Sequence, residues 1–451
     1  MTSLWFATAL LPQGWADGVR ITAAEGRIES VQSGVQPQEG DERHSIAVPG
    51  LGNLHSHSFQ RGLAGLTERR GPTDDSFWSW RELMYRFVER IDPDELEALT
   101  ALAFAEMLEC GFTHVGEFHY VHHDKEGVPF ADPGELAGRI VAAARETGIG
   151  LTLLPTFYAH SGFGAAAPSE RQRRFVCDLD RFERIVESAR EAIGALSGAH
   201  LGVAPHSLRA VSAQELAAVV ELGKGLPKHL HIAEQAREVE ECVLWSGLRP
   251  VEWLMQNAPV DEHWCLVHAT HTNTSELDQI IAAGAVVALC PLTESSLGDG
   301  IFPAPAFMEH NGRFGIGTDS NIRIDVAEEL RTLEYAQRLD LQARNVLASG
   351  PGKSTGRSLF DTALAGGARA LRAPGGLEKG ASLDLVSLAS EHVALAERRG
   401  DDILDSWIFS GDHAVVENVW RAGQKVVSNG RHAQRDAITA RYRRALRTLL
   451  S

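Results

Sequence analysis

The middle of the chain alternates between short apolar runs and amphipathic stretches. The runs are rich in Val, Leu and Ile, as in strands that are buried on both faces. The stretches between them carry apolar residues at helical spacing, and several end at a glycine, the usual residue after a helix. Eight such runs occur, at residues 48–55, 113–119, 150–158, 201–206, 227–233, 264–270, 285–291 and 314–319.

Strand and helix alternating eight times predict an α/β fold with a closed parallel (β/α)8 TIM barrel, which we place at residues 49–371. Both chain ends have the pattern of short strands broken by Gly, Pro and Asp. We expect residues 1–48 and 372–430 to pair into a small composite β-sandwich domain. Residues 431–451 have the pattern of a C-terminal helix with Arg and Lys facing solvent.

Residues 58–90 are the least regular stretch of the predicted barrel. They lie between its first and second strands, on the face where barrel enzymes build their active sites. Trp78, Trp80 and Tyr85 in this stretch require burial. We therefore expect a packed cap over the mouth of the barrel.

The composition narrows the classes of function. The 451 residues carry a formal net charge of −17, which argues against a general nucleic-acid or anionic-membrane surface. Five scattered cysteines without a C-x-x-C pair predict reduced thiols rather than disulfides or a thiolate zinc site. With no apolar stretch long enough to span a membrane and no credible signal peptide, we expect a cytoplasmic enzyme.

His55 and His57 end the first predicted strand. Side chains two residues apart on a strand share a face, so the two imidazoles form a pair at the barrel mouth. Polar residues end three other strands as well: His229, His231 and Glu234 at the fifth, His268 at the sixth and Asp319 at the eighth. Imidazoles mixed with carboxylates suit Zn2+, with Fe2+ as the alternative.

Two other motifs are weaker evidence for a functional site. Residues 350–355, GPGKST, resemble a phosphate loop, but Leu347 stands where that loop requires glycine, and no strand precedes it. Four further histidines lie near the second strand without a matching carboxylate, and we interpret them as structural or exposed: His114, His119, His122 and His123.

The motifs VPGLGNLHSH, HIAEQ, LVHATH and GTDS are similar, in order, to those of the amidohydrolase superfamily, a family of metal-dependent-hydrolase barrels. The resemblance implies that one metal is held by His55, His57, His231 and Asp319. It places His229 a layer deeper, in packing. No lysine ends the fourth strand, where two-metal relatives carry a bridging one, so the resemblance implies a mononuclear site. Glu294 stands where many relatives have asparagine.

The ligand set implies hydrolysis, because a zinc ion held by imidazoles and a carboxylate lowers the pKa of its water toward neutrality. His268 and Asp319 are placed to accept the proton of the water. Glu234 is placed to bind or protonate the nitrogen of the substrate. The sequence does not distinguish which of these residues is the formal base.

Two arginines near the predicted mouth indicate the substrate class. Arg81 lies in the cap stretch, and Arg209 follows the fourth strand. Guanidinium groups grip carboxylates bidentately, so the pair predicts a small anionic substrate, even a dicarboxylate. Gln60, Tyr120 and His206 lie at neighbouring strand ends.

The segments HSHSFQRGLAG, FWSWRELMY, GEFHYVHH, PHSLRAVS and TESSLGDGIFP resemble the formimidoylglutamate deiminase family. That resemblance implies hydrolysis of N-formimino-L-glutamate to N-formyl-L-glutamate and ammonia, a step of histidine degradation. It implies that Arg81, Arg209 and Tyr120 contact the carboxylates, and that Gln60 and His206 orient the formimino group.

Two rival functions stay open. A purine, cytosine or s-triazine aminohydrolase of the same branch would use the cap aromatics as a slot for a flat ring, but would leave the two arginines without a role. A non-catalytic barrel scaffold is remote, because the whole ligand set is present. We also expect a homodimer, since apolar helix faces outside the barrel permit one.

Overall fold

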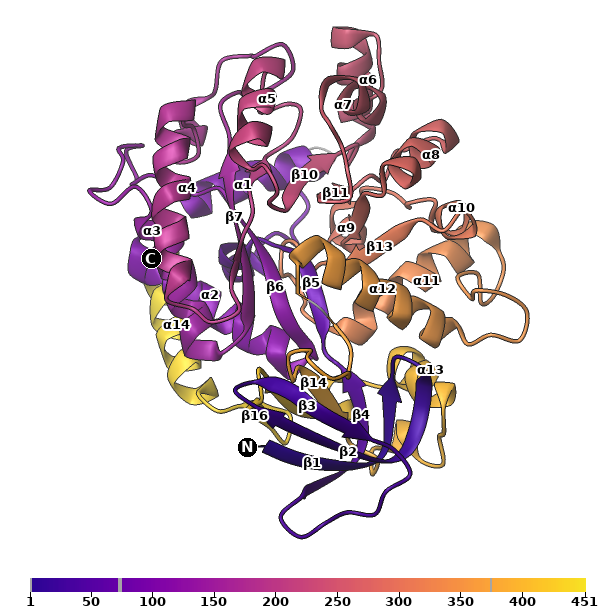
Figure 1. Ribbon diagram of the computed structural model, residues 1–451. Coiled ribbons are helices and arrows are strands. Elements are labelled where there is room, and N and C mark those ends of the chain that lie inside the picture. The colour runs from indigo at the N-terminus through magenta and orange to yellow at the C-terminus, as the bar shows by residue number, and fades with distance from the viewer. Residues whose placement is uncertain (1, 72–74, 374) are drawn as a thin grey trace.

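The computed structural model describes residues 2–71, 75–373 and 375–451, and its centre is a parallel barrel (Figure 1). Two hydrogen-bonded sheets, β5 to β9 and β10 to β13, supply the strands of the barrel. Bridges between Ser56 and Asp319, and between Ser207 and His231, join the two sheets on either side. The barrel strands are β5 (Leu51–Ser56), β6 (Phe112–His119), β7 (Gly150–Phe157), β8 (His200–Leu201) with β9 (Ala204–Pro205), β10 (Lys228–Ile232), β11 (Trp264–His268), β12 (Val286–Leu289) and β13 (Arg313–Ile316).

Each of the eight apolar runs overlaps a strand of the barrel, so the predicted fold class is confirmed. Every residue of β6 and β7 is buried, so neither face of these strands is exposed to solvent. The polar residues that end the strands all emerge at one mouth, because the strands are parallel.

Helices follow the strands and cover the outside of the barrel (Figure 1). Their sequences carry the expected signals: Ser212 and Asn273 cap α5 and α8, and Gly148 ends α3 in the left-handed conformation. They are α2 (Pro93–Glu109), α3 (Glu135–Thr147), α4 (Leu179–Gly194), α5 (Ala213–Leu222), α6 (Ala236–Ser246), α7 (Pro250–Asn257), α8 (Thr274–Ala283), α9 (Pro291–Leu297), α10 (Ala304–Glu309), α11 (Val326–Leu341) and α12 (Thr355–Leu371).

Helix α12 packs unusually close to the barrel. A Cβ atom added at Gly366 would lie 2.0 Å from the carbonyl oxygen of Phe314 on β13. Only glycine fits there, so the helix can lie directly against the strands near the end opposite the mouth.

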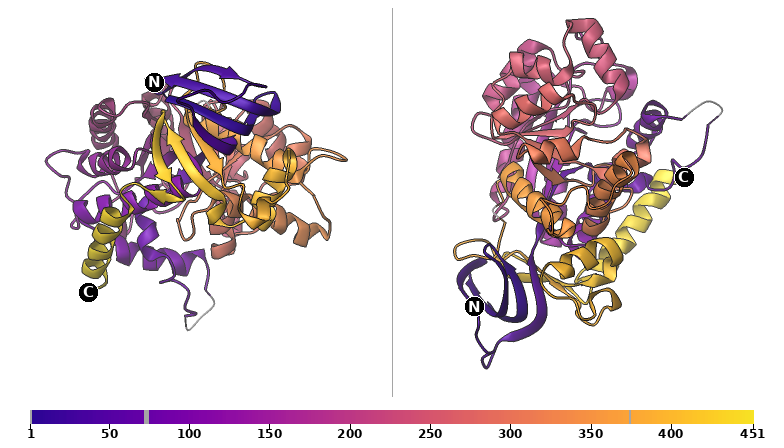
Figure 2. Two further views of the ribbon diagram at one scale, coloured as in Figure 1. Left: turned by 90° about the horizontal axis from the view of Figure 1, so that it is seen from below. Right: turned by 90° about the vertical axis from the view of Figure 1, so that its right-hand side faces the viewer.

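The two chain ends meet in one eight-stranded sheet beneath the barrel (Figure 2). Strand β4 joins the two halves, since it pairs with β1 on one side and with β14 on the other. The strands are β1 (Thr2–Leu11), β2 (Gly14–Ala24), β3 (Arg27–Gln32), β4 (Glu42–Pro49), β14 (Leu385–Leu388), β15 (Val416–Arg421), β16 (Gln424–Ser428) and β17 (Arg431–His432). Helix α13 (Asp401–Ser410) lies between β14 and β15 in the chain, and α14 (Arg435–Leu450) packs on α2.

The stretch that was expected to cap the mouth holds a 3-10 turn, η1 (Ser58–Leu63), and the helix α1 (Phe77–Val88). Phe77, Met84, Tyr85, Phe87 and Val88 of α1 are buried. Across the described residues, no helix combines the length and the apolar character that a membrane span requires.

Candidate active site

Four ligand-type side chains converge at the mouth of the barrel. His55 lies in β5 and His57 directly after it, His231 comes from β10, and Asp319 comes from the loop after β13; all four are buried. The bridge between Ser56 and Asp319 sets the last of these beside the first two. Strands far apart in sequence therefore bring together the residues that the sequence assigned to one metal.

The spacing of the ligand atoms fits a single tetrahedral ion. The Nε2 atom of His55 lies 3.2 Å from Nε2 of His57, 2.9 Å from Nε2 of His231 and 3.4 Å from Oδ1 of Asp319. Nε2 of His57 lies 3.3 Å from the same oxygen. Zinc with nitrogen ligands at ~2.0–2.1 Å separates neighbouring tetrahedral ligand atoms by about 3.3 Å.

The rings of the cluster are oriented and neutral, as metal ligands need to be. Nδ1–H of His57 donates to the carbonyl of Phe118 (2.9 Å), and Nδ1–H of His231 donates to that of His206 (3.0 Å). Both bonds turn a bare Nε2 inward. Burial, and then neighbouring imidazoles, hold the pKa of His55 and His231 well below the usual range. The three unprotonated Nε2 atoms converge on one point and can bind a cation there.

The backbone is strained around this cluster. Ala233, His268 and Asp319 have φ values of 50°, 68° and 39°, in the left-handed region that residues other than glycine rarely adopt. Such strain persists where surrounding structure imposes it, and it gathers at functional sites. His268 ends β11, Ala233 directly follows β10, and Asp319 lies three residues after β13, all at the mouth of the barrel.

Glu234 and His268 lie beside the ligand cluster. Nε2 of His268 is 3.8 Å from Oε1 of Glu234 and 3.8 Å from Oδ2 of Asp319. Burial raises the pKa of Glu234 to about 7, against the opposing influence of His268 and Arg209. Burial alone would lower the pKa of His268, but Glu234, Glu294 and Asp319 outweigh it and raise that pKa to about 10. The pair can hold and release protons near the cluster.

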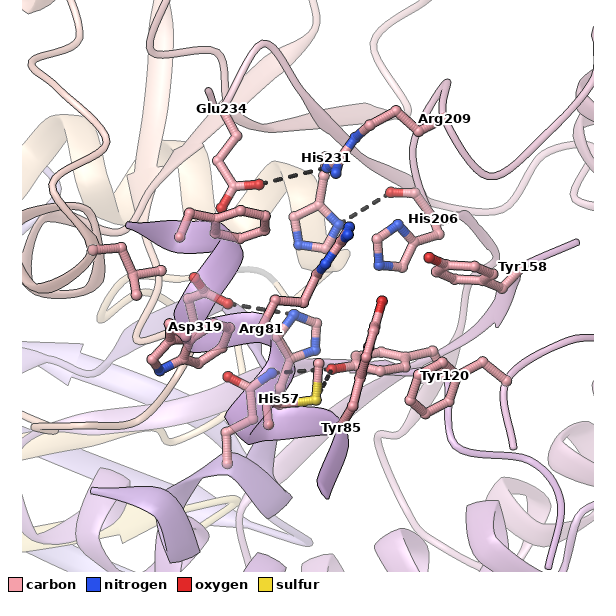
Figure 3. A pocket seen from close by; sticks show the side chains of 16 residues that line it. His57, Arg81, Tyr85, Tyr120, Tyr158, His206, Arg209, His231, Glu234 and Asp319 are labelled. Atoms are coloured by element: carbon pink, nitrogen blue, oxygen red, sulfur yellow. Dashed lines mark hydrogen bonds and ion pairs between the residues drawn. The ribbon is translucent and has the colours of Figure 1, made fainter. Parts of the chain in front are cut away.

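The predicted substrate-binding residues line the same cavity, as Figure 3 shows for Arg81, Arg209, Tyr120 and His206. Gln60 also lines it, and its amide Nε2 donates to the hydroxyl of Tyr120 (3.0 Å), while its buried Oε1 has no partner among the described residues. The ring of His206 lies 4.6 Å from that of Tyr158 and 4.9 Å from that of His231.

Two guanidinium groups enter the cavity from opposite elements, Arg81 from α1 and Arg209 from the loop after β9. Arg209 lies 3.7 Å from Glu234 and 3.8 Å from Glu238. Each arginine has a buried Nε–H without a hydrogen-bond partner in the described part of the chain. Buried unsatisfied donors are costly, so both arginines are suited to an anionic ligand.

Several lining residues were not predicted from the sequence to contact substrate, although Tyr85 was expected to be buried in the cap. Tyr85 stands four residues after Arg81, so helical spacing could have placed both on one face of α1. Tyr158 directly follows β7, at the same strand end as the other site residues. Phe175 gave no signal, because it lies in the long connection between β7 and α4.

The remaining histidines lie elsewhere. His229 is buried, and its Nε2 lies 3.3 Å from the carbonyl of Ala370 on α12, a layer below the ligands. His114 bonds to Thr152 inside the barrel wall. His122 and His123 bond to backbone carbonyls, and His119 is buried with its Nε2 unpaired among the described residues. The described residues of this group contribute no ligand to the cluster.

Comparisons with known proteins agree with this geometry. The model of the amidohydrolase family matches residues 46–426, and that of the formimidoylglutamate deiminase HutF N-terminal domain matches residues 1–45. The chain is 46% identical to a formimidoylglutamate deiminase of Pseudomonas aeruginosa, with 100% of both chains covered. It is 29% identical to a 5-methylthioadenosine/S-adenosylhomocysteine deaminase of Natronomonas pharaonis, over 78% of this chain and 75% of that protein.

One solved structure is similar over its whole length. It is an amidohydrolase from Brucella melitensis, with a TM-score of 0.97, 53% sequence identity and 100% of each chain covered. A triazine hydrolase with a TM-score of 0.84 and 18% identity shares the fold. These likenesses extend over both the barrel and the sheet built from the chain ends.

Proposed function

This chain belongs to the amidohydrolase family, and within it to the formimidoylglutamate deiminases, and from that membership we propose that it hydrolyses N-formimino-L-glutamate to N-formyl-L-glutamate and ammonia. The family is metal-dependent, and the chain is a hydrolase of C–N bonds. The oxygen of water bonds to the formimino carbon, the bond from that carbon to the terminal nitrogen breaks, and the nitrogen leaves as ammonia.

The observation that supports this substrate is the pair of buried arginines beside the ligand cluster. A glutamate moiety presents two carboxylates, and Arg81 and Arg209 both offer unpaired buried donors into the cavity. Guanidinium binds a carboxylate by two parallel hydrogen bonds, which are strong in a site shielded from water. We assign the two carboxylates to Arg81 and Arg209, with Tyr120 as a further donor.

Other residues act on the formimino end. Gln60 and His206 orient the amidine, since both line the cavity next to His57 and His231. Glu234, whose pKa of about 7 lets it carry a proton at neutral pH, donates to the nitrogen that leaves. Asp319 accepts the proton that the water loses, and Nε2 of His268, 3.8 Å from Oδ2 of Asp319, holds that carboxylate in place.

Zinc is the metal that we propose for His55, His57, His231 and Asp319, because three imidazoles and a carboxylate suit it, with Fe2+ as the alternative. When bound, it would supply the acidity that makes water a nucleophile near neutral pH. A homodimer in the cytoplasm stays part of the proposal, and light scattering on purified protein would test the dimer.

A deaminase of a flat ring is the second candidate, because Phe77, Trp80, Tyr85, Tyr158 and Phe175 line the cavity. Aromatic side chains would stack on a purine or triazine. Such a ring carries no carboxylate, however, and would leave the donors of Arg81 and Arg209 unpaired at a cost of ~1–3 kcal/mol each. The arginines therefore favour the linear dicarboxylate.

The test is ammonia release by the metal-loaded protein from N-formimino-L-glutamate, N-formimino-L-aspartate, 5-methylthioadenosine and an s-triazine. We expect turnover of formimino-glutamate, with a KM that rises about 100-fold in Arg81→Met because one charged hydrogen-bonded pair is lost. Arg431→Met, at an exposed arginine of the terminal sheet, is the matched control and should change KM little. Release from a ring alone would overturn the proposal.

A further inference from the structure

The imidazole of His268 has a polar neighbour on the side away from the ligand cluster. This neighbour is Glu294 of α9, whose Oε1 lies 3.1 Å from Nδ1 of His268. Both side chains are buried, with His268 at 0% exposure and Glu294 at 6%. The contact therefore lies in a site without competing solvent, where a hydrogen bond orients strongly.

The carboxylate of Glu294 is itself fixed. Its Oε1 also accepts a hydrogen bond from the backbone N–H of Cys290 at 2.9 Å, at the residue that begins α9. The same short helix is tied to α11, because Oε2 of Glu329 accepts from the backbone N–H of Leu292 at 2.9 Å. An oxygen that already accepts from a backbone donor presents an acceptor to His268, so Nδ1 of the ring carries hydrogen.

The opposite nitrogen of the ring faces the reaction. Nε2 of His268 lies 3.8 Å from both Glu234 and Asp319, and it has no hydrogen-bond partner among the described residues. The backbone at His268 and Ala269 is left-handed, with φ of 68° and 50°, a strained conformation for residues other than glycine. Glu294 supplies the contact that sets the rotation of the ring.

A metal ion shared by His268, Cys290 and Glu294 would be another reason for this cluster, since their ligand atoms lie within 4.8 Å of one another. The hydrogen bonds argue against it. Oε1 of Glu294 is occupied by two donors. Burial raises the pKa of the Cys290 thiol well above its usual range, and a neutral thiol is a poor ligand.

We propose that Glu294 is a positioning residue of the hydrolysis: by accepting from Nδ1–H of His268 it holds Nε2 of that ring toward Glu234 and Asp319. The inference rests on the proposed function, because it gives His268 its role in that reaction. Glu294 does not touch the reacting atoms and acts through the ring. The accepting oxygen carries this role, so an amide oxygen at the same place would preserve much of it.

The first arm of the test is kinetic and compares Glu294→Leu, Glu294→Gln, His268→Asn and Glu329→Gln, all with zinc content measured. Removing an outer hydrogen-bond partner of this kind costs about 10- to 100-fold, so we expect kcat of Glu294→Leu to fall about 100-fold with KM little changed. Glu294→Gln should recover most of that loss. Glu329→Gln is the matched control, since it alters a buried carboxylate that supports the same helix without touching His268.

The second arm reads the ring directly and does not depend on turnover. In protein labelled with 15N-histidine, the Nδ1–H signal that disappears in His268→Asn should persist in Glu294→Gln and be lost or shifted in Glu294→Leu. This arm gives a result even if the wild type proves inactive on formimino-glutamate, which would be a failure of the proposed function alone.

Three results would overturn the positioning role. One is a Glu294→Leu protein that keeps kcat within about threefold of wild type, far short of the loss expected for an outer partner. Another is an unchanged His268 ring signal in that variant. The third is an equal loss of kcat in Glu329→Gln, which would show that any weakening of α9 has the same effect.

Discussion

At the scale of single residues, the site depends on which ring nitrogen or carboxylate oxygen faces inward. His57 and His231 donate from Nδ1 to backbone carbonyls, and the ligand atoms are left bare. Glu234 stands apart from the ligands, with a pKa raised by burial to about 7. A carboxyl group that can carry a proton at neutral pH, next to the ligand cluster, is suited to acid catalysis.

Glu234→Gln tests that role. The amide keeps the size of the side chain but cannot deliver a proton to the leaving nitrogen, so we expect kcat to fall about 10²- to 10⁴-fold. Zinc content should be unchanged, because Glu234 is not among the four ligands. Glu241→Gln, on the outer side of α6, serves as the control. Steady-state ammonia release measures both, and a Glu234→Gln protein as fast as wild type would remove Glu234 from the reaction.

A second prediction concerns His119, which is buried outside the ligand cluster. Burial lowers its pKa to about 3, whereas in the unfolded chain the pKa is near 6.5, the ordinary value for histidine. The unfolded chain therefore binds a proton between these values that the folded protein does not. The resulting stability is present above pH 6.5 and is lost progressively as the pH falls toward 3. By pH 5 the loss from this one group is ~2 kcal/mol.

Chemical denaturation at pH 7 and pH 5 checks this expectation. In His119→Leu, which removes the titrating group, the unfolding free energy should fall by less between the two pH values than in wild type. His413→Leu, at an exposed histidine, is the control. An identical fall in wild type and in His119→Leu would show that His119 does not contribute.

At the scale of elements, the cap helix α1 is held at the mouth by stacked cations. The indole of Trp78 has Arg81 at 4.6 Å, Arg237 at 4.7 Å and Arg209 at 5.7 Å from its centroid. These three arginines come from α1, α6 and the loop after β9. One aromatic ring thus links the cap to α6 and to the loop after β9, and it contacts both substrate arginines.

Trp78→Ala should therefore weaken substrate binding more than catalysis. Each cation–π contact is worth ~0.5–2 kcal/mol, so we expect KM for formimino-glutamate to rise about tenfold, with a smaller effect on kcat. Trp245→Ala, in an aromatic stack on α6, is the matched control. A loss confined to kcat would contradict the view that the cap positions the arginines.

The sequence predicts the strands of the barrel better than the contacts between distant segments. Each barrel strand overlaps a mainly apolar run, and residues with reactive side chains such as His55 and Asp319 stand at or just after strand ends, so the local pattern is enough to place them. The stacking of Trp78 and the closure of the barrel by the Ser56–Asp319 bridge are contacts between distant segments. No local period encodes them. The strand order of the terminal sheet, in which β4 lies between β1 and β14, is hidden for the same reason.

At the scale of the whole molecule, a net-acidic chain places two arginines in its cavity. The formal charge is −17, yet two guanidinium groups and the ligand cluster line the mouth of the barrel. The ligands come from β5, β10 and the end of β13, on both of the hydrogen-bonded sheets that form the barrel. A bound ion would therefore join strands from opposite ends of the barrel sequence.

Removal of the metal should affect stability as well as activity. An ion that binds only the folded chain stabilises it, by ~4 kcal/mol when the free ion exceeds its Kd a thousandfold. We expect a chelator to abolish ammonia release and to lower the melting temperature by at least about 3 °C. Zinc should restore both, and magnesium should restore neither. Unchanged melting and activity after verified metal removal would argue against the site.

The most direct test of the account is the product formed from N-formimino-L-glutamate in water enriched with 18O. The substrate has two C–N bonds at the formimino carbon, and only cleavage of the outer one is a deimination. The account predicts one ammonia per turnover and an N-formyl-L-glutamate that carries one 18O atom at its formyl group. Formamide and free glutamate, or no turnover by protein with zinc bound, would contradict it.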